Sequence, residues 1–345
     1  MLQAWQIQQS FWQRRTFSLC GVQNNSGEEK VSDTERSFGS VIYRKKHKKI
    51  EYLAVKSQTK KKYWGFPKGH ACEGETGIQT PIREVFEETG LKISIIDNFI
   101  AYERYLLCGM INKEVTFYLA GADGQQVTVQ TSEIADFRWG SFEETYDLLT
   151  YSNSRNVLCR AELYLNGGKG IEYREISYDE ITEEFLNGFD RYEEIEKAWR
   201  EEEGRVILKD IKYTEYWDDN ELRKISGELK DTLLKGGCVF AAYFKNVIIG
   251  VAALENNFFG SSKQYLQLSM LHVSRNFRGI GIGKELFRLA QHRAKHMGAK
   301  KIYISASSCE NAQAFYSRLR CVPAQEINPV LYEIEPFDRH LEYNL

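Results

Sequence analysis

Apolar and polar residues alternate along two short stretches near the start of the chain, residues 37–43 and 51–55. A period of two is typical of half-buried strands, so both stretches predict strands. The residues between them, 44–49, are all basic. Such a run is typical of a solvated hairpin turn, and the alternative is a surface that steers polyphosphate or RNA. Further strands are predicted over residues 93–105, 114–120, 126–130 and 137–139.

A helix is predicted over residues 79–89, after a glycine-rich loop. Ile82 and Phe86 lie four residues apart on one side of this helix, and we expect them to anchor it in a core. Gly90 follows as a C-terminal stop, since glycine readily adopts the left-handed conformation found there.

Pro81 is unusual within this helix, because proline is tolerated only in the first turn. Two starts of the helix satisfy that condition. Either Thr80 caps the helix, or Thr76 and Gln79 form the cap and the first turn is distorted.

Glu84, Glu87 and Glu88 share one face of the helix, because they are three or four residues apart. Two carboxylates ~4 Å apart repel each other by about 4 kcal/mol at an effective dielectric constant of ~20. A cluster of this kind needs a cation, and Mg²⁺ or Mn²⁺ is expected because these ions prefer oxygen ligands. The alternative is an acidic, solvated helix face.

The first half ends with two predicted helices, one opened by a capping box of Ser141 and Glu144 and one from about residue 154. A glycine-rich stretch follows over residues 166–170 and marks a domain boundary. The opening 35 residues fit neither domain. The predicted organisation is an N-terminal extension (1–35), a first domain (36–166), a linker (167–170) and a second domain (171–345).

In the second half the pattern restarts with a strand at Ile171 and helical segments through Trp199. A helix over 221–234 precedes a hairpin that turns at Lys245-Asn246. The remaining expected elements are strands over 238–244, 247–254, 265–273 and 300–306, a helix after the glycines that end near 284, and a helix at 311–316.

Composition fits a globular protein, with 345 residues, 42% hydrophobic and 27% charged. The formal charge of −2 argues against a surface that coats nucleic acid. Seven scattered cysteines without a CxxC pair predict reduced thiols and a cytoplasmic location. No apolar run approaches the ~20 residues of a membrane span, so no membrane partner is expected.

A glycine-rich turn follows the strand at 265–273 and leads into a helix. Free backbone N–H groups and the positive end of the helix dipole at such a turn favour a phosphate. A GxGxG pattern alone is a weak signal, because dinucleotide-binding folds use it too. No acidic residue ends a following strand, as ribose binding would require.

The loop and helix of the first half resemble the Nudix box. Each fixed position of that motif is matched, by Gly69, Glu75, Arg83, Glu84, Glu87, Glu88 and Gly90. Over residues 37–165 the chain resembles the asymmetrical diadenosine tetraphosphate hydrolase branch of this family. The shared features are Trp64, the run from Pro67 to His70, Tyr105, Lys113-Glu114-Val115, Glu133 and Phe137-Arg138-Trp139.

This resemblance implies an α/β/α sandwich with a mixed sheet, and hydrolysis by in-line attack of water on phosphorus. Glu84, Glu87, Glu88 and Glu133 would bind Mg²⁺, and one of them would orient or deprotonate the water. Arg83 would hold the glutamates and Glu75 would brace the loop. Substrate contacts are implied for Lys68, Gly69 and His70 on phosphate and for Tyr105 on adenine. Alternatively, His70 is only a loop hydrogen-bonding residue and Tyr105 an ordinary strand tyrosine.

Residues 171–345 resemble the GNAT acetyltransferases, whose fold has a mixed sheet. Arg278, Gly281 and Gly283 match the pyrophosphate turn of that family, and Asn311 and Tyr316 match its following helix. The resemblance implies that acetyl-CoA is a cosubstrate held by the backbone at Leu271, His272 and Val273, by the turn Arg278, Gly279, Ile280, Gly281, Ile282, Gly283 and Lys284, and by Asn311.

Tyr316 would protonate the leaving thiolate, and the alternative is a plain core aromatic. Glu255 and His272 are candidate bases for the attacking amine, although either residue in a strand is commonly structural. Arg320-Cys321 departs from the Gly-Phe common in the family, which leaves the edge of the acceptor pocket open.

The sequence therefore predicts a two-domain α/β (α+β) bifunctional enzyme, a Nudix pyrophosphohydrolase followed by an N-acetyltransferase, acting on small molecules. The favoured reaction of the first domain converts diadenosine tetraphosphate to ATP and AMP. The alternatives are nucleoside triphosphates, nucleotide sugars or capped RNA as substrates, and a second domain that only senses acetyl-CoA or mediates an interaction.

Overall fold

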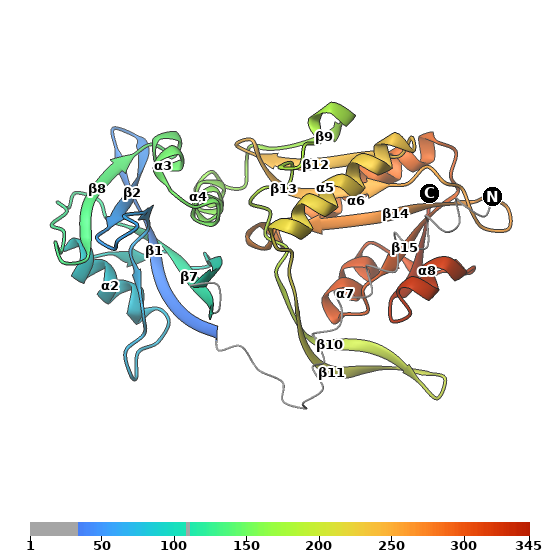
Figure 1. The fold of residues 1–345 in the computed structure, drawn as a ribbon, viewed down its shortest axis with the longest axis horizontal. Coiled ribbons are helices and arrows are strands. Elements are labelled where there is room, and N and C mark those ends of the chain that lie inside the picture. The colour runs from blue at the N-terminus through green and yellow to red at the C-terminus, as the bar shows by residue number, and fades with distance from the viewer. Residues whose placement is uncertain (1–33, 108–110) are drawn as a thin grey trace.

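Two sheet-containing units lie side by side in the computed structural model, which describes residues 34–107 and 111–345 (Figure 1). Nearly all of the predicted N-terminal extension lies outside the described residues. Within them, no helix has the length and apolar character needed to cross a membrane. The prediction of two domains of mixed α/β structure is confirmed.

The first unit is a mixed sheet covered by helices. Its strands follow the order β3-β2-β1-β7-β5, with β4 on β1, β6 on β7 and β8 on β2. Among the strands described in this unit, only β1 and β7 run parallel to each other. The elements are β1 (Thr34–Lys46), β2 (Lys49–Ser57), β3 (Trp64–Gly65), β4 (Lys68–Gly69), α2 (Gln79–Thr89), β5 (Ser94–Ile95), β6 (Ala101–Leu107), β7 (Ile111–Gly121), β8 (Ile134–Gly140), α3 (Phe142–Leu148) and α4 (Ser152–Leu165).

Several predictions for this unit are confirmed. The basic run turns at His47 and Lys48, which both have positive φ, and Ser141 and Glu144 form the capping box of α3. Two strand predictions are wrong. Residues 93–105 are divided between β5 and β6, and residues 126–130 form no strand.

The predicted orientation of α2 is also wrong. Ile82 and Phe86 are 39% and 51% exposed, whereas Val85 is fully buried and anchors the helix. Glu88 shares the buried side with Val85, since the two are three residues apart, and is only 6% exposed. The helix therefore turns a carboxylate inward and leaves apolar side chains in solvent.

The start of α2 follows the second of the two predicted alternatives. Thr76 N donates to Gln79 Oε1 at 2.9 Å, and Thr80 N donates to Thr76 O at 3.3 Å. Pro81 is the third residue of the helix, within the first turn, where its missing N–H costs no hydrogen bond.

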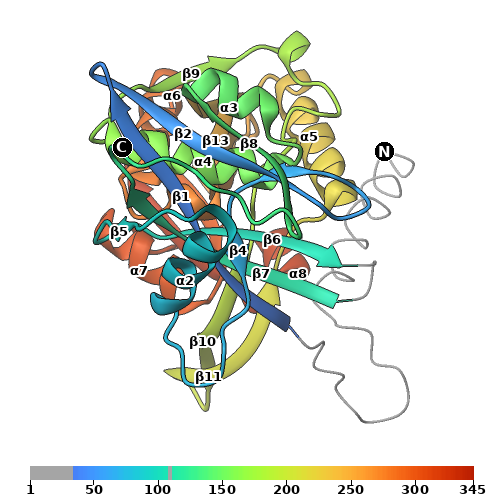
Figure 2. The same ribbon diagram turned by 90° about the vertical axis from the view of Figure 1, so that its left-hand side faces the viewer.

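The second unit is a seven-stranded sheet in the order β16-β17-β15-β14-β13-β12-β9. Helices α5 and α6 pack on this sheet, and the β10–β11 hairpin extends away from both sheets (Figures 1 and 2). The elements are β9 (Ile171–Ile176), η1 (Tyr178–Glu180), β10 (Glu193–Glu202), β11 (Arg205–Glu215), α5 (Asp219–Leu234), β12 (Cys238–Phe244), β13 (Val247–Leu254), β14 (Tyr265–Val273), η2 (Arg275–Phe277), α6 (Ile282–His296), β15 (Lys301–Ala306), α7 (Glu310–Arg318), β16 (Val322–Pro323), α8 (Pro329–Ile334) and β17 (Arg339–Asn344).

The predicted helical segments through Trp199 are wrong, because β10 is a strand. Its glutamate, lysine and alanine residues favour a helix locally. Pairing with β11 along its length overrides that preference, and Ala198 forms a bridge to Cys309 beside α7. The hairpin at Lys245-Asn246 and the strand over 265–273 are confirmed.

Strands β14 and β15 are parallel neighbours for only a short distance. Their paired positions run from Tyr265 opposite Lys301 to Gln267 opposite Tyr303. Beyond Gln267 the strands separate, so a wedge opens between the carboxyl ends of β14 and β15.

Helix α4 joins the two units. Ser154 donates to Glu103 of the first unit, and Asn156 donates to Gly188 O of the second. Each helical residue advances by about 100°, so residues two apart lie on nearly opposite sides. Half of α4 is buried, and one apolar core runs from the first sheet through this helix into the second sheet.

Candidate functional site

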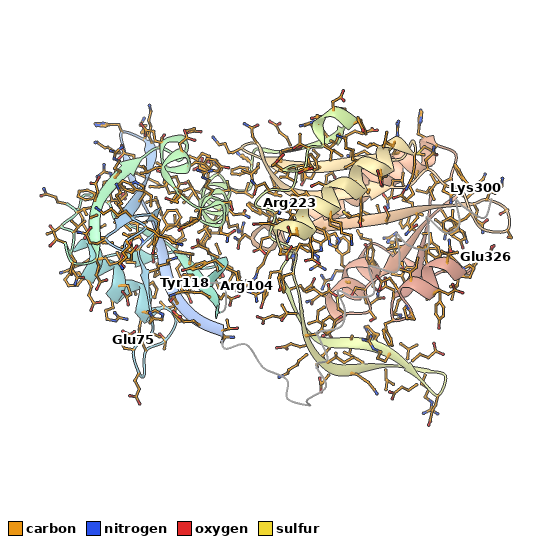
Figure 3. The ribbon with its side chains drawn as sticks, viewed as in Figure 1. Glu75, Arg104, Tyr118, Arg223, Lys300 and Glu326 are labelled. Atoms are coloured by element: carbon orange, nitrogen blue, oxygen red, sulfur yellow. The ribbon has the colours of Figure 1, made fainter. Side chains whose placement is uncertain are left out.

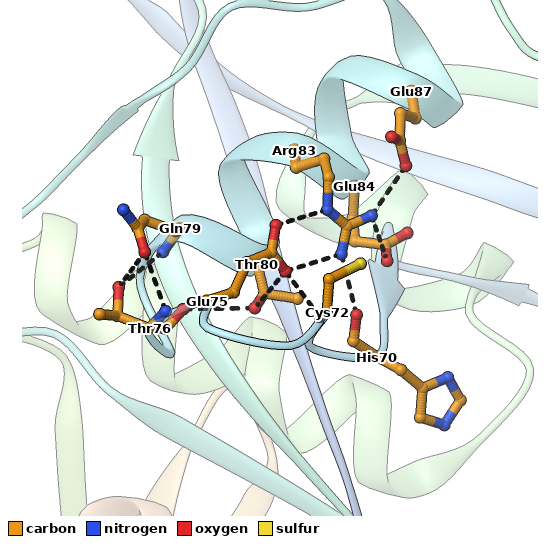
Figure 4. A network of polar contacts seen from close by, with 9 residues as sticks. All are labelled: His70, Cys72, Glu75, Thr76, Gln79, Thr80, Arg83, Glu84 and Glu87. Carbon is orange, nitrogen blue, oxygen red and sulfur yellow. Dashed lines mark hydrogen bonds and ion pairs between the residues drawn. The ribbon is translucent and has the colours of Figure 1, made fainter.

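Arg83 of α2 connects the loop before the helix with its carboxylates (Figure 4). Its guanidinium donates to both oxygens of Glu75 at 2.7 and 3.0 Å, to Glu84 at 2.9 Å and to Glu87 at 2.8 Å. It also donates to His70 O at 2.9 Å. The bidentate contact with Arg83 lowers the pKa of Glu75 to about 2. Arg83 therefore fixes the loop against the first two turns of α2.

Gly69 allows the carboxylate of Glu84 to lie directly against β4. A Cβ built on Gly69 would be 2.0 Å from Cδ of Glu84, far inside van der Waals contact. The loop can approach this close only because position 69 lacks a side chain.

Glu88 is the buried member of the carboxylate cluster. Burial, followed by the charges of Glu84 and Glu133, raises its pKa to about 8. Its Oε2 has no hydrogen-bond partner among the described residues. Burial likewise raises the pKa of Glu84, although Arg83 opposes this shift. Glu84, Glu88 and Glu133 thus repel one another, and a cation would relieve the repulsion.

The fit of a metal to this cluster is partial. Within the described residues, no group of three or more His, Cys, Asp or Glu side chains is arranged to hold an ion. Glu84 and Glu87 instead share Nη1 of Arg83. Two features nevertheless fit oxygen ligands of a divalent cation when the cation is absent. One oxygen of Glu88 has no hydrogen-bond partner among the described residues, and the pKa values of Glu84 and Glu88 are raised.

Lys68 lies behind this cluster and binds two residues of β6. Its Nζ is 3.4 Å from Glu103 Oε2 and 3.2 Å from the hydroxyl of Tyr105. Burial acts to lower the pKa of Lys68, but the Glu103 carboxylate and the hydroxyls of Tyr105 and Tyr63 together outweigh burial, so the pKa is raised. Glu103 was not predicted as a site residue from the sequence. Its signal was a carboxylate among the apolar and aromatic residues of a predicted strand.

His70 lies apart from the carboxylates. Its ring contacts Glu35 and lies 3.3 Å from Nζ of Lys113, pointing away from the Arg83 network (Figure 4). Glu133 is exposed on the loop before β8, with its charge near Glu84 and Glu88. The structure therefore brings Glu84, Glu88, Glu133 and Arg83 together and leaves His70 with Glu35.

In the second unit, the predicted pyrophosphate turn follows β14 and ends at α6. Gly279 and Gly281 have φ values of 80° and 95°, with nothing near a hypothetical Cβ. Arg278 Nε donates to Val273 O at 2.9 Å and fixes the turn to the end of β14. Ile280, Gly281 and Lys284 are exposed, so the N-terminus of the 15-residue helix α6 opens to solvent.

Tyr316 and Asn311 lie on α7, on different sides. Tyr316 is buried, its ring packs edge-on against Phe287 and Phe315, and burial raises its pKa. Asn311 lies in the first turn of α7, facing residues 194–197 of β10. Tyr316 thus has the surroundings of a core aromatic, and its catalytic role stays a prediction.

The two candidate bases have different surroundings. Glu255 accepts hydrogen bonds from Thr232 and Ser269 at 2.9 and 2.6 Å. His272 lies at the end of β14, where its Nδ1 accepts from Nε of Arg191 at 3.0 Å. Arg191 also binds Glu193 and Glu215, each at 3.0 Å. Arg191 was not predicted from the sequence, because it meets His272 from a distant segment of the chain.

Comparison with protein families divides the chain at the same place as the structure. The NUDIX domain model matches residues 33–161, and the acetyltransferase (GNAT) family model matches residues 178–320.

Curated relatives match the first unit. The asymmetrical bis(5'-nucleosyl)-tetraphosphatase of Sus scrofa is 28% identical over 146 residues, covering 38% of this chain and 95% of that protein. The NAD-capped RNA hydrolase NudC of Mannheimia succiniciproducens is 36% identical over 73 residues, covering 21% of this chain and 26% of that protein.

Solved structures match each unit separately. An Ap4A hydrolase binary complex from C. elegans is 28% identical and covers 39% of this chain and 98% of its own, with a TM-score of 0.37. Nourseothricin acetyltransferase is 16% identical and covers 50% of this chain and 96% of its own, with a TM-score of 0.38.

Proposed function

Because residues 33–161 belong to the NUDIX domain family and residues 178–320 to the acetyltransferase (GNAT) family, we propose that this chain is a bifunctional enzyme. Its first domain hydrolyses a pyrophosphate bond of a nucleoside polyphosphate, and its second transfers an acetyl group from acetyl-CoA to an amine. The domains extend over residues 36–166 and 171–345, joined by 167–170. The cytoplasmic location expected from the cysteine pattern stays a prediction.

The carboxylate cluster of α2 carries the first half of this proposal. The charge of Glu133 acts to raise the pKa values of both Glu84 and Glu88, and Glu88 keeps an oxygen without a partner in the described structure. These residues, with Glu87 after release from Arg83, would hold Mg²⁺ or Mn²⁺. A bound divalent cation would neutralise phosphate charge and lower the pKa of an attacking water.

The chain's own residues supply the rest of the hydrolytic site. Lys68 keeps its positive charge and would bind a phosphate oxygen of the substrate. The hydroxyl of Tyr105 accepts a hydrogen bond from the Lys68 ammonium group and positions it. Arg83 and Glu75 fix the loop, so Glu84 keeps its position at Gly69. A carboxylate of the cluster accepts the proton of the water as it attacks phosphorus.

The preferred substrate is diadenosine tetraphosphate, cleaved to ATP and AMP. The similarity of the first unit to asymmetrical bis(5'-nucleosyl)-tetraphosphatases over almost their whole length supports this choice. Tyr105 of β6 would stack on one adenine, since its ring lies next to Lys68, the residue expected to contact phosphate.

For the second domain, the wedge between β14 and β15 carries the proposal. Acetyl-CoA would pair along Leu271–Val273, with its pyrophosphate at the exposed turn before α6. This arrangement directs the thioester toward His272 and the group around Arg191.

Hydrolysis of diadenosine tetraphosphate with Mg²⁺, with products separated by chromatography, tests the first activity beside nucleoside triphosphates, ADP-ribose and capped RNA. ATP plus AMP from the tetraphosphate is the expected result, and preference for another substrate would discard this one. Calorimetry with acetyl-CoA tests the second site. Inactivity on the whole panel would overturn the hydrolase proposal.

A further inference from the structure

A cavity of about 370 Å³ lies between the two units. The first unit contributes residues of β6 and α4 to its walls, and the second contributes the segments around 188–192 and 216–222. Its volume is within the roughly 300–1,000 Å³ of small-molecule sites. Arg104 lies on the side of the first unit that faces the second (Figure 3).

Asn156 of α4 supplies a buried acceptor at this cavity. Its Nδ2 donates to Gly188 O at 2.9 Å, which fixes the orientation of the amide. The side chain is 5% exposed, and Oδ1 has no partner among the residues that the structure describes. An unpaired buried oxygen costs about 1–3 kcal/mol, so this position favours a ligand that donates a hydrogen bond.

Asp190 adds a second acceptor to the same walls. One of its oxygens accepts from Tyr192 N at 3.1 Å. Burial raises its pKa, against the opposing charge of Arg275. A carboxylate that has lost water in this way gains most from a donor that carries positive charge.

Arginine side chains lie over the tyrosine rings at this cavity. Cζ of Arg104 lies 4.2 Å from the ring centroid of Tyr192 and 5.2 Å from that of Tyr216, and Arg275 lies 4.4 Å from the ring of Tyr192. Trp217 provides a further ring in the cavity. Aromatic faces of this kind favour an ammonium or a flat ring.

Trp217, which lines the cavity, places its wall next to the predicted acetyl-transfer site. The ring centroid of Trp217 is 4.8 Å from that of His272, and Arg191, between Asp190 and Tyr192 in sequence, donates to His272. His272 is part of the strand end expected to hold the pantetheine arm.

We propose that the cavity between the units is the acceptor site of the acetyltransferase and that it binds a small aromatic or apolar molecule carrying a primary ammonium group. Asn156 and Asp190 bind the ammonium, and the rings of Tyr192, Tyr216 and Trp217 contact the rest. The first domain thereby supplies part of the acceptor site of the second. This inference rests on the proposed acetyl transfer.

In the reaction, the deprotonated amine nitrogen forms a bond to the acetyl carbonyl carbon, and the carbon–sulfur bond of acetyl-CoA breaks. The products are an N-acetyl amide and a free thiol. Of the two protons lost by the ammonium nitrogen, one ends on the thiolate sulfur and the other in solvent.

Calorimetry on the full chain tests the site with tyramine, compared with 4-ethylphenol, which has the same ring but no amine. Tyramine is expected to bind at least about tenfold more tightly, as a charge-assisted hydrogen bond implies. Asp190→Asn should remove most of this preference while keeping the acceptor for Tyr192 N. Asp179→Asn, on exposed η1 outside the cavity, is the matched control.

Arg104→Met separates binding from damage to the fold. Removing Arg104 frees the face of Tyr216 and leaves Arg275 as the cation at Tyr192, so tyramine should bind about two- to fivefold more tightly. A disrupted site would give weaker binding instead. Equal binding of tyramine and 4-ethylphenol, or equal effects of Asp190→Asn and Asp179→Asn, would overturn the inference.

Acetyl-CoA binding, measured on the same samples, keeps the two proposals distinct. If acetyl-CoA binds but Asp190→Asn does not change the binding of tyramine, this acceptor site is refuted and the proposed activity is not. Failure to bind acetyl-CoA would instead refute the proposed transferase.

Discussion

Asn276 binds both backbone polar atoms of Tyr102, so a side chain of the second unit pairs with the edge of β6 as a strand would. Tyr102 N donates to Asn276 Oδ1 at 2.8 Å, and Asn276 Nδ2 donates to Tyr102 O at 2.9 Å. Arg275, next to it, binds Glu114 of β7 at 2.8 Å. The segment just before the predicted pyrophosphate turn is thereby fixed to the sheet of the other unit.

Asn276→Ala should lower the free energy of unfolding by about 2 kcal/mol, because it leaves two polar groups of β6 without partners. Denaturant unfolding of the full chain measures the change. Asn220→Ala, at an exposed position of α5, should have little effect. A loss no larger than that of the control would mean that water replaces Asn276 at no cost.

Gly69→Ala should reduce hydrolysis by roughly a hundredfold, since the new Cβ would displace the Glu84 carboxylate. Steady-state hydrolysis with Mg²⁺ measures the effect. The control is Gly227→Ala in α5, where nothing lies within 4 Å of the added methyl group. Unchanged hydrolysis in Gly69→Ala would show that Glu84 need not lie against β4.

Glu88 should make the metal-free protein less stable as pH rises. Its pKa is about 8 in the folded state against 4.5 as the ordinary value, so the folded state holds a proton that the unfolded state releases. The free energy of unfolding should therefore fall between about pH 4.5 and pH 8 and then level off. Thermal unfolding with a chelator, at a series of pH values, measures this dependence.

Glu88→Gln should remove that component of the pH dependence, and Glu183→Gln, at an exposed position, should keep it. Added Mg²⁺ should restore stability above pH 8 in the unmodified protein and in Glu183→Gln, but not in Glu88→Gln. Identical pH profiles for the Glu88→Gln and unmodified proteins would contradict the raised pKa.

Gly281→Ala should weaken acetyl-CoA binding. Gly281 and Gly298 each have φ of 95°, at the two ends of α6, and neither has a neighbour near an added Cβ. Both alanine variants should lose about 1–3 kcal/mol of stability from backbone strain. Calorimetry should show weaker acetyl-CoA binding for Gly281→Ala alone; equal weakening would place the pyrophosphate elsewhere.

The sequence predicted most elements whose local pattern and tertiary environment agree. The strand over 265–273 and the turn at Lys245-Asn246 are examples, because hydrophobic alternation and turn residues determine them locally. The failure at β10 has a tertiary cause. Residues of β10 favour a helix locally, and their pairing with the next strand, β11, and with the distant Cys309 makes them a strand.

The site was predictable to the extent that a motif concentrates it in one segment. Arg83 and the glutamates of α2 come from a few turns of chain, so their spacing was informative. Glu103, Arg191 and Asn156 were missed because their importance arises from contacts between distant segments. The inward orientation of Glu88 was missed for the opposite reason, since apolar Ile82 and Phe86 suggested the wrong buried side.

Helix α4 has a consequence for how this protein can be divided. The side of α4 that carries Ser154 contacts the first unit and the side that carries Asn156 contacts the second, so one helix is shared by both units. Cutting the chain at residues 167–170 would leave α4 with the first unit. The apolar surface of the second unit that α4 covers would then be exposed to solvent. The two units are therefore not independent modules joined by a flexible linker, and lengthening residues 167–170 would not separate them.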